Sequence, residues 1–253
     1  MIAISLQSGS NGNCTYVDAG GVRLLFDAGL PGRETRDRLR RHGRDICKVD
    51  ALIISHDHAD HARCAGVLHR MYGIPLYATH GTLEESAPRI GRVTRVRSFD
   101  AGETLSVGGL RIETFPTPHD GAESVAFVVT AGRRRLGILT DLGHVFNGLQ
   151  EVLASLDGVF IESNYDEDLL ASGPYPPLLK ARIRGPGGHI SNEESAAVMR
   201  ACAGARLRWA CLAHLSETNN DPAIALRTHR RVWAKGFPLY VASRHEATGP
   251  FEL

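Results

Sequence analysis

The chain has 253 residues, of which 43% are hydrophobic, and a formal net charge of +1 at pH 7. This length and composition can bury one large core or two packed halves without a covalent staple, and the balanced charge gives no overall attraction to a polyanion. The chain has five cysteines, an odd number with no C-x-x-C pair, which favours reduced thiols in a cytoplasm over a disulfide framework or a structural zinc knuckle.

The N-terminal half is expected to alternate strands with helices. Residues 1–6 turn polar within a few positions and lack a basic lead-in, so we expect no signal peptide, and no run along the chain is apolar enough for a membrane span. Apolar runs between Gly-rich turns predict strands at 2–6, 15–17, 22–26, 51–55, 74–78, 93–98, 104–116, 123–130 and 134–140. Helices are predicted at 33–42 and 61–72.

The C-terminal half continues this alternation. It predicts helices near 146–155, 176–184 and 191–203, strands at 158–162 and 208–213, and a final helix beginning near 221–222. No linker or repeat interrupts the pattern, so we expect one domain over residues 1–253. Strands and helices in this order predict an α/β fold in which two mixed sheets pack together between outer helices, a four-layer αββα sandwich.

A cluster of metal-ligating side chains follows the apolar run 51–55. Residues 56–61 have the pattern H-x-H-x-D-H, with His56, His58, Asp60 and His61 as the ligand candidates. Neutral imidazole and carboxylate are the donors that Zn, Mn and Fe select, and a loop leaving a buried strand is a suitable place for them. The pattern therefore predicts a metal site and not a chance run of surface histidines.

Three further candidate ligands lie where other predicted strands end. They are His119 after residues 110–118, Asp141 after 136–140 and His214 after 209–213. A single residue of this kind is more often a structural histidine or a helix-capping aspartate. Because the pattern recurs, and because a catalytic metal needs several donors and one open position, we expect all three to project from one edge of the sheets.

These residues, in this order, resemble the metallo-β-lactamase fold superfamily over nearly the whole chain. Asp27, in LLFDAG, matches the first signature position, and residues 56–61, His119, Asp141 and His214 match the next four. Narrower similarity to the YycJ/WalJ-type branch comes from SGSNGNC (8–14), ESNYD (162–166), YPPLLKARI (175–183), GHISN (188–192) and HLSETNN (214–220). That branch is associated with 5′-to-3′ DNA exonuclease activity, although its members are often described only as metal-dependent hydrolases.

Donor geometry and this resemblance together predict two divalent metal ions, of Zn, Mn or Fe. The first would be held by His56, His58 and His119, the second by Asp60, His61 and His214, with Asp141 bridging both. Metals about 3.5 to 4 Å apart can share a hydroxide that attacks phosphorus in line, and this hydroxide is the predicted nucleophile. Asp60 is counted among the predicted catalytic residues as a ligand of the metal pair that would hold this hydroxide. By resemblance, Asp27 would orient the metal loop from behind the ligands.

His189 is the predicted catalytic residue outside the ligand set. It lies between Gly187-Gly188 and Ile190-Ser191-Asn192, where glycines let a phosphate approach the backbone, so it could supply the leaving group with a proton. A purely structural role stays open. The predicted substrate contacts are Asn164, Lys180, Arg182, Asn219 and Asn220.

DNA is the predicted substrate, with two alternative classes of function left open. Among the basic clusters, Lys180 to Arg184 is favoured as a phosphate track because His189 follows closely. An ester or thioester hydrolase of glyoxalase II type would use the same ligands, but in a compact pocket and not in an open basic groove. A non-catalytic metal-binding module is disfavoured because it has little use for a complete pair of sites.

Overall fold

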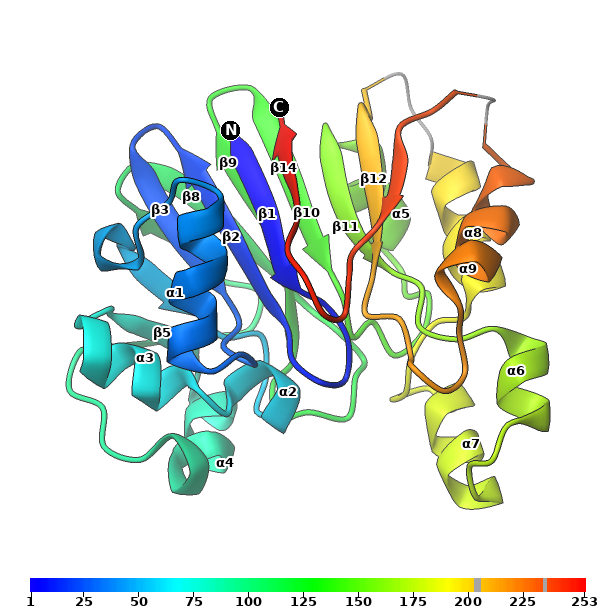
Figure 1. Ribbon diagram of the computed structural model, residues 1–253, viewed down its shortest axis with the longest axis horizontal. Coiled ribbons are helices and arrows are strands. Elements are labelled where there is room, and N and C mark those ends of the chain that lie inside the picture. The colour runs from blue at the N-terminus through cyan, green and yellow to red at the C-terminus, as the bar shows by residue number, and fades with distance from the viewer. Residues whose placement is uncertain (203–205, 234–235) are drawn as a thin grey trace.

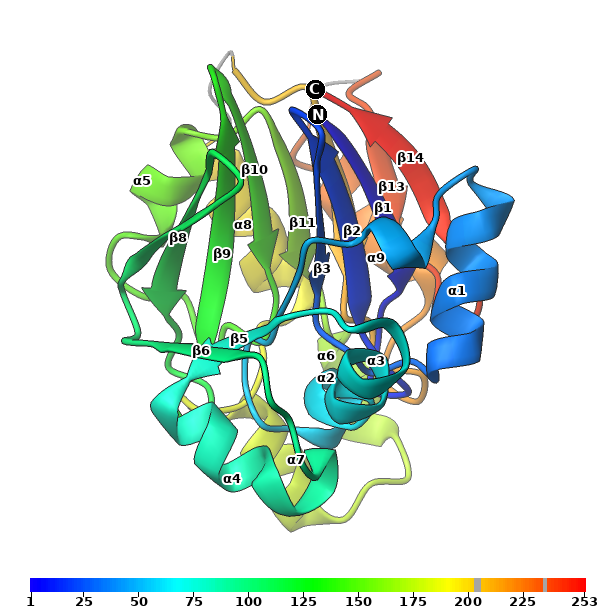
Figure 2. The ribbon, with the colours of Figure 1, turned by 90° about the vertical axis from the view of Figure 1, so that its left-hand side faces the viewer.

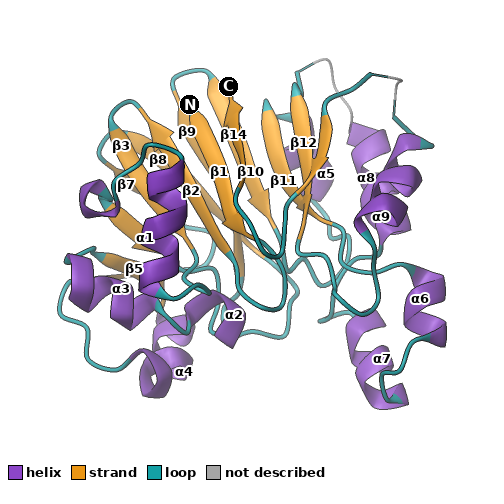
Figure 3. Cartoon of the chain, viewed as in Figure 1, coloured by secondary structure: helices purple, strands orange, loops and turns teal. Residues whose placement is uncertain are grey.

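The computed structural model describes residues 1–202, 206–233 and 236–253. In this part of the chain, two seven-stranded sheets pack face to face, and helices cover the outer face of each (Figures 1 and 3). The two termini lie together at one end, where the first and last strands pair. The predicted four-layer α/β sandwich is confirmed, whereas one domain over residues 1–253 stays a prediction.

The first sheet has the order β14-β1-β2-β3-β4-β5-β6. Its strands are β1 (Ile2–Gln7), β2 (Cys14–Ala19), β3 (Val22–Phe26), β4 (Ala51–Ile53), β5 (Leu76–Thr79), β6 (Val96–Phe99) and β14 (Thr248–Glu252). The strands pair antiparallel from β14 to β3 and parallel from β3 to β6, so the sheet is mixed.

The second sheet has the order β13-β12-β11-β10-β9-β8-β7. Its strands are β7 (Thr104–Val107), β8 (Leu110–Pro116), β9 (Val125–Ala131), β10 (Arg134–Leu139), β11 (Gly158–Glu162), β12 (Trp209–Ala213) and β13 (Leu239–Val241). Pairing is antiparallel from β7 to β10 and parallel from β10 to β13. In each sheet the parallel strands run from the centre to one side, and their carboxyl ends lie at the same end of the sandwich.

Hydrophobic clusters lie between the two sheets and also between each sheet and its outer helices, because the strands are apolar on both faces. Along β3, Leu24 and Phe26 join the cluster between the sheets, whereas Leu25 packs against the outer helices. The Phe26 ring meets Phe127 of the facing sheet at a centroid distance of 5.0 Å. Burial on both faces explains why these strands are nearly continuous apolar runs and not alternating ones.

Helices form the two outer layers and one projecting unit. The first sheet is covered by α1 (Gly32–Arg41), α2 (Ala59–Ala62), α3 (Ala65–Tyr72) and α4 (His80–Ile90), together with the short 3-10 helix η1 (Ile46–Lys48), and the second by α5 (Leu149–Ala154), α8 (Asn192–Cys202) and α9 (Pro222–Arg230). The helices α6 (Glu167–Ser172) and α7 (Pro177–Arg184) extend from the end opposite the termini (Figures 1 and 2).

Several predicted boundaries are wrong for physical reasons. The single helix over 61–72 is two helices, because the Cys64 backbone N–H turns away to donate to the Ala28 carbonyl. The strand predicted over 104–116 is a hairpin that turns at Gly108-Gly109, where both φ angles are positive. Residue 203, the last of the helix predicted over 191–203, lies outside the described residues.

Among the described residues, five elements were not predicted at all: η1, α4, α6, β13 and β14. Pro88 and Gly81 argue against a helix over 80–90, but the Thr79 side chain accepts a hydrogen bond from the Thr82 N–H and starts α4.

Among the described residues, Cys14, Cys47, Cys64 and Cys211 form no disulfide. No described helix combines the length and apolarity that crossing a membrane requires.

Candidate metal centre

All seven predicted ligands lie together at the end of the sandwich opposite the termini. His56 to His61 follow β4, and His119, Asp141 and His214 follow β8, β10 and β12. The ligand atoms fall into overlapping groups in which all lie within 4.8 Å of one another: His56, His58 and His119; His56, His61 and Asp141; Asp60, His61 and His214. Residues far apart in the sequence thus form one cluster.

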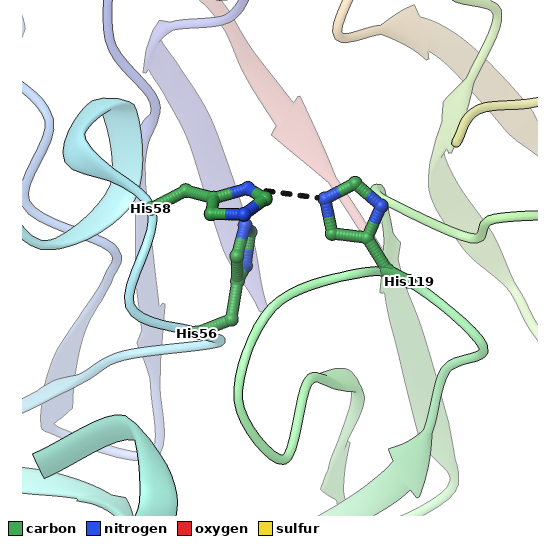
Figure 4. A group of neighbouring side chains, drawn as sticks. All are labelled: His56, His58 and His119. Carbon is green, nitrogen blue, oxygen red and sulfur yellow. Dashed lines mark hydrogen bonds between the residues drawn. The ribbon is translucent and has the colours of Figure 1, made fainter. Parts of the chain in front are cut away.

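The first group consists of three imidazoles that point toward one another (Figure 4). His58 Nδ1 lies 3.2 Å from His119 Nε2. His119 Nδ1 is 2.8 Å from the Gly188 carbonyl oxygen, which can only accept a hydrogen bond. That bond fixes the proton on Nδ1 and leaves Nε2 as a donor for a metal.

The second group is built around carboxylates. Asp60 Oδ2 lies 3.3 Å from His214 Nε2 and 3.5 Å from His61 Nε2. Asp141 Oδ2 lies 3.2 Å from His61 Nε2, and its Oδ1 lies 3.5 Å from His214 Nδ1 and 3.7 Å from His119 Nε2. Asp141 therefore contacts members of both groups, as a bridging ligand would.

Three site residues have left-handed backbone conformations. The φ angles of Asp27, Asp141 and His214 are 64°, 57° and 56°. Asp27 and His214 directly follow β3 and β12, and Asp141 lies two residues after the end of β10. This region costs a non-glycine residue roughly 1–3 kcal/mol and persists where the surrounding structure enforces it, often at functional sites. Here the left-handed turn stops the strand and directs the side chain into the cluster.

Two buried polar atoms show that the cluster fits a divalent cation. Within the described chain, His56 Nε2 and Asp141 Oδ2 are buried and have no hydrogen-bond partner. An unsatisfied buried polar group costs about 1–3 kcal/mol, which coordination to a metal would offset. Imidazole nitrogens and carboxylate oxygens are the ligands that Zn, Mn and Fe select, so the residues present fit divalent metal ions.

The electrostatics of the cluster differ between its two groups. Burial lowers the pKa of His56 well below its ordinary value, and His61 lowers it further. Burial acts in the same direction on His61 and His214, but neighbouring carboxylates outweigh it: Asp141 raises both pKa values, that of His214 to about 10. The imidazoles beside Asp141 hold the pKa of its carboxyl well below the usual range despite its burial.

Metal binding is therefore expected to release protons. The raised pKa of His214, about 10, means that this imidazole carries a proton near neutral pH until a metal displaces it. Affinity should rise with pH between 6 and 8 by about tenfold per pH unit for each proton displaced. Titration calorimetry in buffers of different ionisation enthalpy measures the released protons, and a metal affinity that is constant over this range would contradict the expectation.

Asp27 and Asn13 support the metal loop from behind. Asp27 Oδ2 is 2.8 Å from His61 Nδ1, and its Oδ1 accepts a 2.8 Å bond from the Ser55 backbone N–H. This placement suits the orienting role that resemblance implied for Asp27. Asn13 Nδ2, which sequence reasoning missed, lies 3.2 Å from Asp60 Oδ2 and 2.9 Å from His61 Nε2.

Glu162 is the most important residue that the sequence analysis did not assign. It is 0% exposed, its Oε1 lies 2.6 Å from His189 Nδ1, and its Oε2 accepts a hydrogen bond from the Leu142 N–H. Burial raises the pKa of Glu162, but the adjacent His189 outweighs burial and the net shift is downward. Like the predicted ligands, Glu162 is a polar residue that ends an apolar strand, so the same signal would have found it.

A cavity of about 250 Å³ opens beside the cluster. One side is formed by His58, Asp60, Asp141, His189 and His214, and the other by residues of α7 and its preceding turn. Two of the predicted substrate contacts, Asn164 and Arg182, line this cavity. Asn164 also donates a 2.7 Å hydrogen bond to the His214 carbonyl, so it fixes the loop that carries this ligand.

The other three predicted substrate contacts do not line this cavity, and their side chains bond to other parts of the protein. Lys180 Nζ donates to the Ala171 carbonyl at 2.7 Å. Asn219 is fully buried and bonds to Ser216 Oγ, while Asn220 donates to the backbone carbonyls of Ser163 and Asn164. These placements support a role in holding loops for Asn219 and Asn220 and give no support to direct substrate contact.

Comparisons with known proteins agree with this site. The family model described as "Beta-lactamase superfamily domain" matches residues 22–214. The chain is 36% identical to exodeoxyribonuclease WalJ of Streptococcus pneumoniae, covering 88% of this chain and 84% of that one. It is 33% identical to exodeoxyribonuclease YycJ of Bacillus anthracis, over 97% and 94% of the two chains.

A solved structure with the same fold is the metallo-beta-lactamase fold protein YhfI from Bacillus subtilis. It has a TM-score of 0.75 at 16% identity, and the match covers 98% of both chains. This structural similarity concerns the fold, whereas the family model and the two exodeoxyribonucleases concern the sequence. The chain belongs to the β-lactamase superfamily of metallo-β-lactamase fold proteins, as its motifs predicted.

Proposed function

We propose that this protein is a metal-dependent exodeoxyribonuclease that hydrolyses phosphodiester bonds of DNA. The observation that carries the proposal is the ligand cluster, which meets a cavity whose opposite wall presents Arg182. A guanidinium facing a cationic metal centre suits a phosphate between them. The two exodeoxyribonucleases support DNA as the substrate because their similarity spans most of each chain. We adopt 5′-to-3′ polarity and a cytoplasmic location as part of the proposal.

The proposal includes two divalent ions, of Zn, Mn or Fe. His56, His58 and His119 would hold one, Asp60, His61 and His214 the other, and Asp141 would contact both. When bound, two such ions supply a nucleophile at neutral pH and neutralise charge on the scissile phosphate.

The chain's own residues would bind the substrate and handle the leaving group. Arg182 has a side chain that is 58% exposed, so its guanidinium can reach a phosphate at the mouth of the cavity. His189 lines the cavity, and its contact with Glu162 assigns the proton to Nδ1. When the His189 ring also carries a proton on Nε2, that proton can pass to a leaving oxygen, and the ring is left as a neutral imidazole protonated on Nδ1.

The proposal is tested with a panel of substrates. Protein stripped of metal and reloaded with Zn, Mn or Fe should degrade 5′-phosphorylated single-stranded DNA and hydrolyse a small phosphodiester, and a chelator should stop both reactions. Mononucleotides released progressively from the labelled 5′ end would establish the polarity. Rapid hydrolysis of a thioester with no cleavage of DNA would instead support the function of glyoxalase II type.

DNA cleavage is expected to depend steeply on salt. Each Lys or Arg that contacts a phosphate releases counterions, so log kcat/KM should fall linearly with log salt, by about 0.7 per contact on single-stranded DNA. Arg182→Gln should weaken cleavage and make this slope shallower. Hydrolysis of the small phosphodiester in the same salt series provides the control for metal loss. An equal rate on DNA at low and high salt would contradict a phosphate track.

A further inference from the structure

The carboxylate of Asp120 lies between the metal cluster and α7, and it is not one of the seven predicted ligands. Its Oδ1 is 3.3 Å from His58 Nε2 and 3.7 Å from His119 Nε2. Its Oδ2 accepts a 2.6 Å hydrogen bond from Arg182 Nε. The two oxygens of one carboxylate therefore contact different parts of the site. One faces predicted metal ligands, and the other holds the guanidinium proposed to bind phosphate.

Backbone contacts fix the place of this carboxylate. The Asp120 N–H donates a 3.0 Å hydrogen bond to the Gly187 carbonyl, and His119 Nδ1 donates to the Gly188 carbonyl. A Cβ on Gly188 would lie 2.1 Å from the Ile183 carbonyl oxygen, so only glycine fits between this turn and the end of α7. Replacing the Asp120 side chain leaves these contacts in place, so variants at this position should fold.

The contact with His58 bears on which of its ring nitrogens can bind a metal. His58 Nδ1 and His119 Nε2 face each other at 3.2 Å within the first ligand group (Figure 4). Each atom needs a free lone pair to bind an ion, so the proton of a neutral His58 ring must then be on Nε2. Nε2 is the nitrogen that faces Asp120 Oδ1. A carboxylate in this place favours the binding tautomer, and losing such a partner typically costs about 10- to 100-fold in metal affinity.

The bond to Arg182 bears on phosphate binding. Arg182 belongs to α7, none of whose eight residues, all of which the structure describes, is buried, and its side chain is 58% exposed. A long exposed side chain loses rotamer freedom when it binds a ligand, unless another group already holds it. Asp120 bonds to Nε, so the terminal nitrogens of the guanidinium can still bind a phosphate. The carboxylate thus holds this fork in place beside the cluster.

We propose that Asp120 is a positioning residue that links metal binding to substrate binding. Through Oδ1 it orients His58 for the first metal ion, and through Oδ2 it orients Arg182 for the phosphate. This inference rests on the proposed nuclease function and adds to it a residue that contacts neither the ion nor the DNA. Removal of this carboxylate should therefore weaken two separate interactions, each of which can be measured by itself.

The first measurement is metal affinity, which does not depend on turnover. Metal-free Asp120→Ala is titrated with Zn²⁺ in competition with a chromophoric chelator, and we expect one of the two ions to bind about 10- to 100-fold more weakly than in the wild type. Asp168→Ala, which removes an exposed carboxylate from the neighbouring α6, is the matched control and should bind both ions as the wild type does. Wild-type affinity for both ions in Asp120→Ala would overturn the proposal.

The second measurement is KM for DNA at saturating metal. An acidic side chain near a DNA-binding site repels phosphates, so its charge alone predicts a lower KM for Asp120→Ala. Positioning predicts the opposite sign: KM should rise about 10-fold, the loss expected for one hydrogen bond to a charged group, because Arg182 is no longer held. Asp168→Ala should have a KM equal to or below that of the wild type. An unchanged or lower KM in Asp120→Ala would overturn the proposal.

A double-mutant cycle assigns the rise in KM to Arg182. Arg182→Gln and Asp120→Ala should each raise KM, and the double variant should have the KM of Arg182→Gln, because both changes remove the same phosphate contact. Two increases that multiply in the double variant would show that Asp120 acts independently of Arg182 and would overturn the proposal.

Asp120→Asn tests whether both oxygens are needed. Its amide has one acceptor oxygen, whereas His58 Nε2 and Arg182 Nε both present a proton to this side chain. The variant should therefore recover at most one of the two properties, metal affinity or KM. Full recovery of both would contradict the proposal. Thioester hydrolysis without DNA cleavage by the wild type would overturn the nuclease function, whereas the metal titration would still test the contact with His58, so the two failures are distinguishable.

Discussion

Asp141→Ala is expected to lower the content of both metal ions and to reduce hydrolysis to background. Its carboxylate lies within 3.2 to 3.7 Å of ligand nitrogens from His61, His119 and His214, so its removal takes a donor from both groups. The loss of metal affinity should exceed the roughly 10- to 100-fold that is typical when a residue behind the ligands is removed. Metal analysis after gel filtration, together with DNA cleavage, measures both effects.

His119→Ala provides the comparison that identifies Asp141 as shared. Its ring belongs to the group formed with His56 and His58, so its loss should chiefly reduce the content of one ion. Two full equivalents of metal in Asp141→Ala would rule out the bridging role. Equal loss of both ions in the two variants would show that the ions bind as one unit.

Asp157→Ala controls for damage to the fold. Asp157 is a buried carboxylate at the opposite end of the same sheet, where its Oδ2 accepts a hydrogen bond from the Arg135 N–H. Its removal should destabilise the protein but leave the metal content unchanged. Metal loss confined to Asp141→Ala would therefore reflect coordination and not instability.

The ligands could be predicted from the sequence because each one carries a local signal. His56 to His61 form a compact motif, and His119, Asp141 and His214 each lie within three residues after the end of an apolar strand. Strand ends of the two sheets meet at one edge, so a polar residue at such an end is placed by topology alone. The structure brings these residues together, which the sequence order by itself does not require.

Residues that depend on tertiary contacts were harder to predict. Lys180 and Arg182 are both basic residues of α7, but helical periodicity puts Arg182 on the side with Leu179 and Ile183, whereas Lys180 turns to the Ala171 carbonyl. Asn13 lies in the glycine-rich loop before β2 and contacts Asp60, which is 47 residues away in the sequence. No local pattern distinguishes such an asparagine from an exposed one.

The break in the helix predicted over 61–72 has the same origin. The sequence favours one continuous helix, but the Cys64 N–H bonds to the Ala28 carbonyl and the Asn13 N–H bonds to the Asp60 carbonyl. These contacts hold the metal loop against its neighbours and end α2 after a single turn. These tertiary hydrogen bonds outweigh the local helix propensity. As a result, the loop presents Asp60 and His61 to the cluster.

His189→Ala is expected to keep its metal and lose most of its activity on DNA. Proton donation by a positioned side chain is typically worth about 10² to 10⁴ in rate, so turnover on DNA should fall within that range. The loss should be smaller on a phosphodiester with an activated phenol as leaving group, because that group departs without a proton. Metal analysis and rates on the two substrates check both expectations.

Two further variants separate the role of His189 from its surroundings. Glu162→Gln retains the size of the side chain at the 2.6 Å contact with His189 Nδ1 but removes its charge, so it should cause a smaller loss with the same dependence on the leaving group. His144→Ala removes an exposed imidazole that donates to the Pro186 carbonyl and should have no effect on either substrate.

The metal content of His189→Ala decides between two roles for this residue. Asp141, Glu162, His189 and His214 lie close enough together to hold an ion, so loss of metal in the variant would identify His189 as a ligand. Near-normal cleavage of DNA by a variant with its full metal content would instead assign His189 to the structure of the loop. Only full metal content with a loss that depends on the leaving group supports proton donation, because neither a ligand nor a structural residue would distinguish an alkoxide from a phenolate.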